Sequence, residues 1–166
     1  RDVAPSRGLG DVYKRQGIMD ALSEANVPVS NVRQIDYHTV FGSPVPSTSS
    51  YKSYEELFFP VDYTAVIGFN DLQSYSAMEI LKERGYRIPE DISLISFDHL
   101  RKTHTYLPPL TSVADNTDKS IADTAVSILL NKIKNLDSKF TGAVLPVTIF
   151  DEHTTGPVNK AFEASF

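Results

Sequence analysis

Polar side chains follow three short apolar runs of the sequence, each at the point where the run ends. In chain order these polar residues are Asn70, Asp71, Asp98, His99, Asp115 and Asn116. Carboxylates and amides can exchange hydrogen bonds with the vicinal hydroxyls of a sugar or the polar edge of another small molecule. Phe69 and Phe97 precede two of these groups, and an aromatic face can cover the apolar side of a ring. Apolar walls with a few convergent polar groups predict a small-molecule pocket.

The same residues also suit simpler roles. Asn70 or Asp71 can cap a following helix, although both cannot serve the same cap. Asp115 and Asn116 can cap a helix that begins near Asp118, and Asp98 can form a turn. The neighbouring His99 could pair with it as a catalytic base, but a solvent-exposed loop histidine is the commoner case.

The composition and the motifs of the sequence exclude several classes of protein. The 166 residues contain no cysteine, which excludes disulfides and thiolate metal sites. We find no GxSxG, Gly-rich phosphate loop or HExxH motif, and the four histidines are scattered, so we expect neither an enzyme nor a bound cofactor. The net charge of −5, without a basic cluster, argues against direct binding of nucleic acid. No apolar run approaches the roughly 18 residues of a membrane span, and we expect a cytoplasmic protein.

Alternating apolar patterns predict an α/β chain. We expect helices at Gly17–Asn26, Asn70–Arg84 and Asp118–Ile133, and strands at Val32–Tyr37, Ala65–Phe69, Ile92–Phe97, Thr111–Val113 and Val144–Ile149. Strand–helix–strand alternation favours a doubly wound parallel sheet with helices on both faces. Ligands of such folds bind beyond the carboxyl ends of the strands, where the polar residues above would lie.

Three segments together resemble the LacI/GalR family of bacterial regulators. They are AVIGFND at Ala65–Asp71, LKERGYRIPEDISLISFDH at Leu81–His99 and PPLTSV at Pro108–Val113, where the family pattern reads PPLTTV. Ser96 replaces the usual glycine before the Phe-Asp pair, and His99 replaces the usual second aspartate. The resemblance implies a type I periplasmic-binding-protein-like fold. It also implies an effector, expected to be a sugar, and a homodimer that binds operator DNA through a separate headpiece.

The resemblance also implies roles for single residues. Asn70 and Asp98 match positions that bind effector hydroxyls or polar edges, and Asp115 matches an effector-facing position. Tyr75 and Tyr106 match the dimer interface and should be exposed on a monomer. Periplasmic sugar-binding transport receptors share the architecture and are the alternative. The upstream gene sequence would discriminate the two classes.

The segment order suggests an incomplete protein. Residues 1–16 resemble the translation of a transposon sequencing adapter, and they include Lys14, where the family has an effector-binding arginine. Residues 17–115 would form most of the C-terminal effector-binding subdomain, residues 116–150 a helix and strand of the other subdomain, and residues 151–166 a return segment and loose tail. The first strand of the C-terminal subdomain would be missing, so we expect the isolated chain to be insoluble or molten.

Overall fold

The computed structural model describes residues 9–35, 57–102, 104–115, 121–134 and 142–163. These form two compact units, Arg1–Asp62 and Tyr63–Phe166. Asn116 and the last two residues of the predicted strand Val32–Tyr37 lie outside the described residues.

Helix α1 of the first unit, Leu9–Glu24, begins eight residues before the predicted start at Gly17. Helix formation is local, and residues 11–16 contain no glycine or proline to stop it, so the helix continues through the adapter-like segment. The helix ends at Glu24, two residues before the predicted end, and Asn26 follows in the left-handed conformation with φ of 58°. None of the described side chains of α1 is fully buried.

The predicted strand at Val32–Tyr37 is wrong over its described part. A 3-10 turn occupies Val29–Asn31, Val32 has extended backbone, and residues 32–35 belong to no helix or strand. An extended segment becomes a strand only when a neighbour pairs with it, and no described strand does so here. Instead the guanidinium of Arg33 donates to the carbonyls of Phe58 and Pro60 at 3.1 and 3.0 Å.

The second unit contains a four-stranded sheet of order β1-β2-β3-β4. The strands are β1 (Ala65–Ile67), β2 (Ser93–Phe97), β3 (Ser112–Asp115) and β4 (Val147–Phe150). The first three run parallel, whereas β4 pairs antiparallel with β3, as Ser112 opposite Phe150 and Asp115 opposite Val147. The α/β class is therefore confirmed, with a sheet that is mixed at one edge and parallel elsewhere. Among the described residues, no strand pairs with the outer edge of β1.

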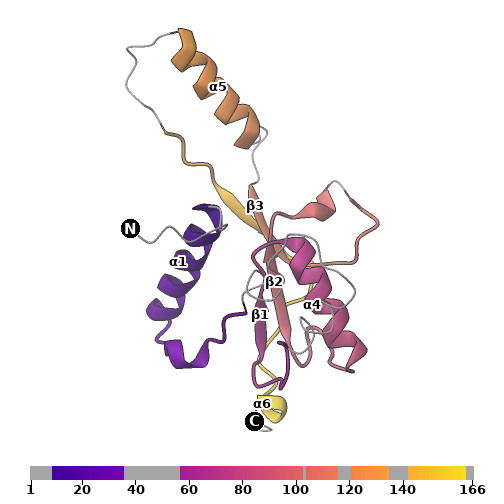
Figure 1. Cartoon of the computed structure of the whole chain (residues 1–166). Coiled ribbons are helices and arrows are strands. Elements are labelled where there is room, and N and C mark those ends of the chain that lie inside the picture. The colour runs from indigo at the N-terminus through magenta and orange to yellow at the C-terminus, as the bar shows by residue number, and fades with distance from the viewer. Residues whose placement is uncertain (1–8, 36–56, 103, 116–120, 135–141, 164–166) are drawn as a thin grey trace. The chain divides into compact units, whose positions relative to one another are not determined.

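Helix α4, Asp71–Glu83, connects β1 to β2 and packs against β2 (Figure 1). Its inward face and the neighbouring strands supply most of the buried apolar side chains, namely Ala77, Met78, Ile80, Leu81, Ile92, Leu94 and Leu110. The helix ends at Glu83 with Arg84 as its cap residue, and Gly85 then takes φ of 87°, the left-handed conformation that commonly follows a helix end. The core therefore lies between α4 and the middle of the sheet.

A pair of buried serines joins α4 to β2. The hydroxyls of Ser74 and Ser96 share a hydrogen bond of 2.7 Å, and both side chains are fully buried. Gly68 makes room for this contact, because a Cβ on that residue would lie 1.8 Å from Ser74 Oγ. The unusual serine of the Phe-Asp segment is thus matched by a polar partner on the helix.

The segment that directly follows β4 is fastened to the sheet through Thr154. The N–H of Leu94 donates to the carbonyl of Thr154 at 2.7 Å, and the buried Thr154 hydroxyl donates back to the Leu94 carbonyl at 2.6 Å. The N–H of Thr111 donates to the same hydroxyl at 2.9 Å. Buried polar groups need such partners, so this segment is part of the folded layer. A short helix, α6, follows at Lys160–Glu163.

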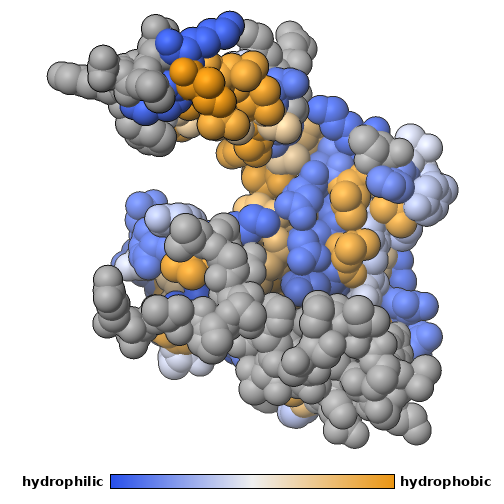
Figure 2. Space-filling view, turned by 45° about the horizontal axis from the view of Figure 1, so that its top comes forward, coloured by the Kyte–Doolittle hydropathy of each residue, from blue (hydrophilic) through white to orange (hydrophobic). Residues whose placement is uncertain are grey.

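Helix α5, Ile121–Lys134, has a pronounced apolar face but no buried residue. Apolar side chains gather on this helix in Figure 2, and the large exposed ones are Ile121, Val126, Leu129, Leu130 and Ile133. No helix in the described parts of the chain is long and apolar enough to cross a lipid bilayer.

Candidate functional site

The registers of the sheet bring the predicted polar residues to one edge. β1 pairs with β2 as Ile67 opposite Ile95, and the same offset, continued beyond the ends of the strands, sets Asn70 level with Asp98. β2 pairs with β3 as Phe97 opposite Val113, which leaves Asp115 one residue beyond the level of Asp98. The carboxyl ends of the parallel strands thus carry an amide and two carboxylates in one row. The same offset sets Phe69 level with Phe97, and both rings are half-buried.

The turn after β2 has a constrained backbone. Asp98 has φ of 100° and His99 has φ of 51°, in the left-handed region that disfavours residues with a side chain. Such strain costs on the order of 1–3 kcal/mol per residue and persists only where surrounding contacts enforce it. Three successive N–H groups supply those contacts: Asp98 to the Val113 carbonyl at 3.0 Å, His99 to Ser112 Oγ at 3.0 Å, and Leu100 to Asp71 Oδ2 at 2.6 Å. The turn is held in place while the Asp98 side chain stays exposed.

Asn70 caps α4. Its side-chain oxygen accepts a hydrogen bond from the N–H of Gln73 at 2.9 Å, and its carbonyl accepts one from the Ser74 hydroxyl at 3.0 Å. The residue is half-buried, with extended backbone at the cap position. The simpler role weighed for the Asn-Asp pair therefore belongs to Asn70, whose amide nitrogen is not needed for the cap.

Asp71 is neither a cap nor an exposed ligand. Its side chain is 1% exposed, and besides the Leu100 N–H it accepts a hydrogen bond from the Ser112 hydroxyl at 2.8 Å. Sequence reasoning missed this role. One signal in the sequence pointed to it. Only one member of the Asn-Asp pair can cap the helix, so the side chain of the other must have a different partner. The residue that uses it, Ser112, is 41 positions away in the chain.

Asp115 ends β3 and is half-buried. Its carboxylate accepts a long hydrogen bond of 3.3 Å from the N–H of Ile121, the first residue of α5. This contact agrees with the helix-capping alternative, and it leaves acceptor capacity on the carboxylate. The residue therefore lies where the chain leaves the sheet.

His99 packs on the sheet and forms no catalytic pair in the described structure. Its ring stacks on Phe150 of β4 with centroids 4.0 Å apart and planes 9° apart. Its Nδ1 is buried without a hydrogen-bond partner among the described residues. In the described parts of the chain, no group of three or more His, Cys, Asp or Glu side chains is placed to hold a metal ion.

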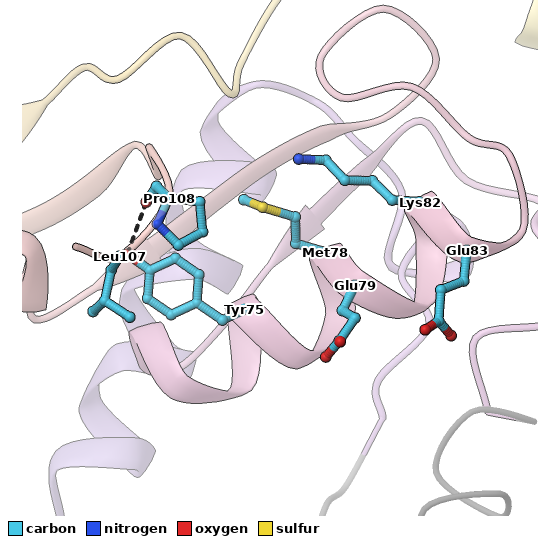
Figure 3. Close-up of a pocket in the computed structure, with 7 residues that line it drawn as sticks. All are labelled: Tyr75, Met78, Glu79, Lys82, Glu83, Leu107 and Pro108. Carbon is cyan, nitrogen blue, oxygen red and sulfur yellow. Dashed lines mark hydrogen bonds between the residues drawn. The ribbon is translucent and has the colours of Figure 1, made fainter.

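A groove of about 510 Å³ lies between α4 and the Leu107–Pro108 segment, and we call it the α4 groove (Figure 3). Its lining residues are Tyr75, Met78, Glu79, Lys82, Glu83, Leu107 and Pro108. The Tyr75 hydroxyl donates to the Pro108 carbonyl at 3.1 Å, and the residue packs against the core cluster of Met78, Leu94 and Leu110. Burial and the nearby charge of Asp71 raise the pKa of Tyr75, against a smaller opposite effect of Arg101. An apolar floor thus lies beside charged side chains.

The two tyrosines singled out by the sequence differ in exposure. Tyr106 is 80% exposed, as expected. Tyr75 is half-buried, and the expectation that it is exposed is wrong. It lies on the side of α4 that meets Pro108, so the Leu107–Pro108 segment covers part of its ring.

Comparison with known proteins decides the family. Residues 13–155 match the family described as periplasmic binding protein-like domain. The chain belongs to this family. The HTH-type transcriptional repressor PurR of Aliivibrio salmonicida is 36% identical over 120 residues, which are 72% of this chain and 34% of that repressor. The chain therefore spans about a third of the length of the curated relatives it matches.

Solved structures of the LacI family share the fold. A regulator from Enterococcus faecium with bound ribose has a TM-score of 0.70 at 21% identity, over 90% of this chain and 53% of that one. A regulator from Enterococcus faecalis V583, also with bound ribose, has a TM-score of 0.57 at 25% identity, over 68% and 42%. The resemblance to the LacI/GalR effector-binding core is confirmed. The relatives are transcription regulators, which agrees with a binding domain and not an enzyme.

Proposed function

We propose that this periplasmic-binding-protein-like chain forms much of the effector-binding core of a LacI/GalR-type transcriptional repressor, and that the effector is a sugar or sugar derivative. The observation that carries the proposal is the row of Asn70, Asp98 and Asp115 at the carboxyl edge of the sheet. This edge is where open α/β sheets bind ligands. The ribose bound by the Enterococcus faecalis relative supports a sugar as the first ligand to test.

Each residue of the row would meet the effector differently. The exposed Asp98 carboxylate would accept from a hydroxyl, while Asn70 would donate through the amide nitrogen that its cap leaves over. Asp115 would accept through the oxygen not used by Ile121. Phe69 and Phe97 would cover the apolar face of the ring. The remainder of the pocket would come from the other subdomain, to which we assign residues 116–150.

The intact repressor would work by changing the relative orientation of two subdomains. Effector binding can shift that orientation only if its affinity differs between the two states. We assign residues 17–115 to the C-terminal subdomain and operator binding to a headpiece outside this chain. We place the protein in the cytoplasm, where operator DNA is found. Repressor relatives favour this function over a periplasmic transport receptor.

Asp98→Ala in the full-length protein tests the effector site. The change removes a charged acceptor worth roughly 1.5–3 kcal/mol, so effector affinity should fall by about ten- to a hundredfold. Isothermal titration with ribose, then with other mono- and disaccharides, measures the affinity. Operator binding without effector should survive, which separates loss of the site from loss of the fold. Unchanged affinity would remove Asp98 from the site.

We further propose that Tyr106 and the α4 groove contribute to a homodimer in the full-length protein. An apolar floor with charged sides suits a two-fold contact with a second copy. Tyr106→Asp should shift the sedimentation profile toward monomer, because it adds a charge to an exposed aromatic side chain. Val144→Asp, at a residue that is 99% exposed and outside the groove, is the matched control. A dimer that persists in the Tyr106 variant contradicts this interface.

A further inference from the structure

Asp71 lies where helix, sheet and turn meet, although it is buried too deeply to bind an effector itself. It is the first residue of α4, and a carboxylate at a helix N-terminus is stabilised by the helix dipole. One oxygen accepts from the Leu100 N–H at 2.6 Å and the other from the Ser112 hydroxyl at 2.8 Å. The carboxylate thus bridges the turn after β2 and the first residue of β3.

Ser112 relays the contact to the turn. Its hydroxyl donates to Asp71 while its oxygen accepts the His99 N–H at 3.0 Å. A hydroxyl that donates to a charged acceptor becomes a better acceptor itself, so the two bonds reinforce one another. The N–H groups of His99 and Leu100 are therefore both fixed, directly or through Ser112, by one buried carboxylate.

The turn held in this way carries Asp98. Asp98 and His99 both take positive φ values, 100° and 51°, which these residues would leave if the contacts were removed. Relaxation of φ at Asp98 would redirect its side chain, because the Cβ direction follows the backbone. The direction of the exposed carboxylate thus depends on a residue 27 positions earlier in the chain.

We propose that Asp71, acting through Ser112 and Leu100, is the positioning residue of the effector site, holding the Asp98 turn in its binding conformation. The inference rests on the proposed function, because it assigns Asp98 to effector binding. It divides the Asn-Asp pair into two roles. Asn70 caps the helix and faces the effector, and Asp71 turns inward to hold the neighbouring strand end.

Two buried serines allow a matched experiment. Ser112 and Ser96 lie directly opposite each other on β3 and β2, and both are fully buried. Ser112→Ala removes the relay, whereas Ser96→Ala removes the hydrogen bond to Ser74 and a long contact of 3.5 Å to the Phe97 carbonyl, and none to the N–H groups of residues 98–100. Ser112→Thr restores a hydroxyl and should rescue. Asp71→Asn keeps the side-chain volume but cannot accept from both donors at once.

The variants are compared in the full-length protein by titration with ribose, followed by the panel sugar that the wild type binds if ribose is not bound. Hydrogen exchange of peptides spanning residues 98–102 is measured in parallel. We expect Ser112→Ala and Asp71→Asn to weaken binding by about tenfold or more and to speed exchange in the turn. Ser96→Ala should change affinity by less than about threefold, and Ser112→Thr should bind like the wild type.

Equal losses of affinity in Ser96→Ala and Ser112→Ala would overturn the inference, since general destabilisation would then explain both. Faster exchange with unchanged affinity would overturn it as well, because the turn would not need to be held. If Asp71→Asn fails to fold, the comparison of Ser112→Ala with Ser112→Thr tests the positioning role. If the wild type binds no sugar of the panel, the proposed function fails and the inference falls with it. If the wild type binds a sugar and Ser112→Ala binds it equally well, the inference is wrong while the proposed function stands.

Discussion

Helices α4 and α5 make opposite use of the same kind of sequence pattern. Both carry apolar residues at helical spacing, and the pattern of α5 is the clearer one. Yet α4 buries Ala77, Met78, Ile80 and Leu81 against the sheet, while α5 buries none of its residues. An amphipathic pattern therefore predicts that a helix forms and which face it offers, but burial needs a partner surface.

The difference has a bearing on the proposed organisation. The α4–β2 layer contains its own partners within the described residues, down to the Ser74–Ser96 hydrogen bond. The apolar face of α5 is large for a monomeric surface, and the proposed function assigns this helix to the other subdomain. Substitutions in the two helices and in the loop after α4 test this difference in burial.

The largest effect is expected at Leu81, which is fully buried on α4. Leu81→Ala should lower the free energy of unfolding of the full-length protein by about 2–5 kcal/mol, because it leaves a cavity as well as losing apolar burial. Leu72→Ala, at a residue on the same helix that is 67% exposed, should change it by about 0.5 kcal/mol or less. Urea denaturation followed by circular dichroism measures both. Similar losses would mean that the outer face of α4 is also covered.

The second effect concerns α5 in the isolated 166-residue chain. We expect that chain to be insoluble or to melt without cooperativity, because the exposed stripe of α5 favours association. Replacing Leu129 and Ile133 by lysine should raise its soluble fraction after expression. Lysine at Val144, which is almost fully exposed outside the helix, should not. A soluble wild-type monomer with a sharp thermal transition would show that the stripe is covered in this chain.

The smallest effect lies at the end of the loop that joins α4 to β2. A hydrogen-bonded ion pair with Arg87 lowers the pKa of Asp91 from 3.8 to about 2. A depressed carboxyl pKa adds stability that is complete above the unfolded pKa and is lost as the pH falls through the folded one. The melting temperature of the wild type should therefore be slightly higher than that of Asp91→Asn at pH 5–7. The difference between the two melting temperatures should disappear between about pH 4 and pH 2.

A double variant checks the origin of that pH dependence. In an Arg87→Gln background, the stability difference that Asp91→Asn produces should shrink, because the guanidinium is the main cause of the lowered pKa. A stability difference that stays the same in the Arg87→Gln background would assign the lowered pKa to the backbone N–H of Arg87 or to the Asn159 amide instead.

Local signals in the sequence predicted the parts of the fold that depend on neighbours in the chain. The helix at Asp71–Glu83, a cap from one member of the Asn-Asp pair and the two parallel strands on either side were all predicted. These features follow from turn chemistry, caps and apolar periodicity, which act over a few residues. The carboxyl-edge position of Asn70, Asp98 and Asp115 followed from the same alternation of strand and helix.

Contacts between distant segments decided the rest. The sequence determined that an Asn-Asp pair follows a buried strand, but only the folded layer decided that Asp71 turns inward to Ser112 and Leu100. It determined that Tyr75 lies on a helix, but the Pro108 carbonyl decided that its ring is half-covered. It determined an extended run at Val32 and an apolar run at Val147, but a partner strand was available only to the second. The reason is the same in each case. A polar group is buried only when another part of the chain supplies a hydrogen-bond partner, and the local sequence does not show which distant segment will do so.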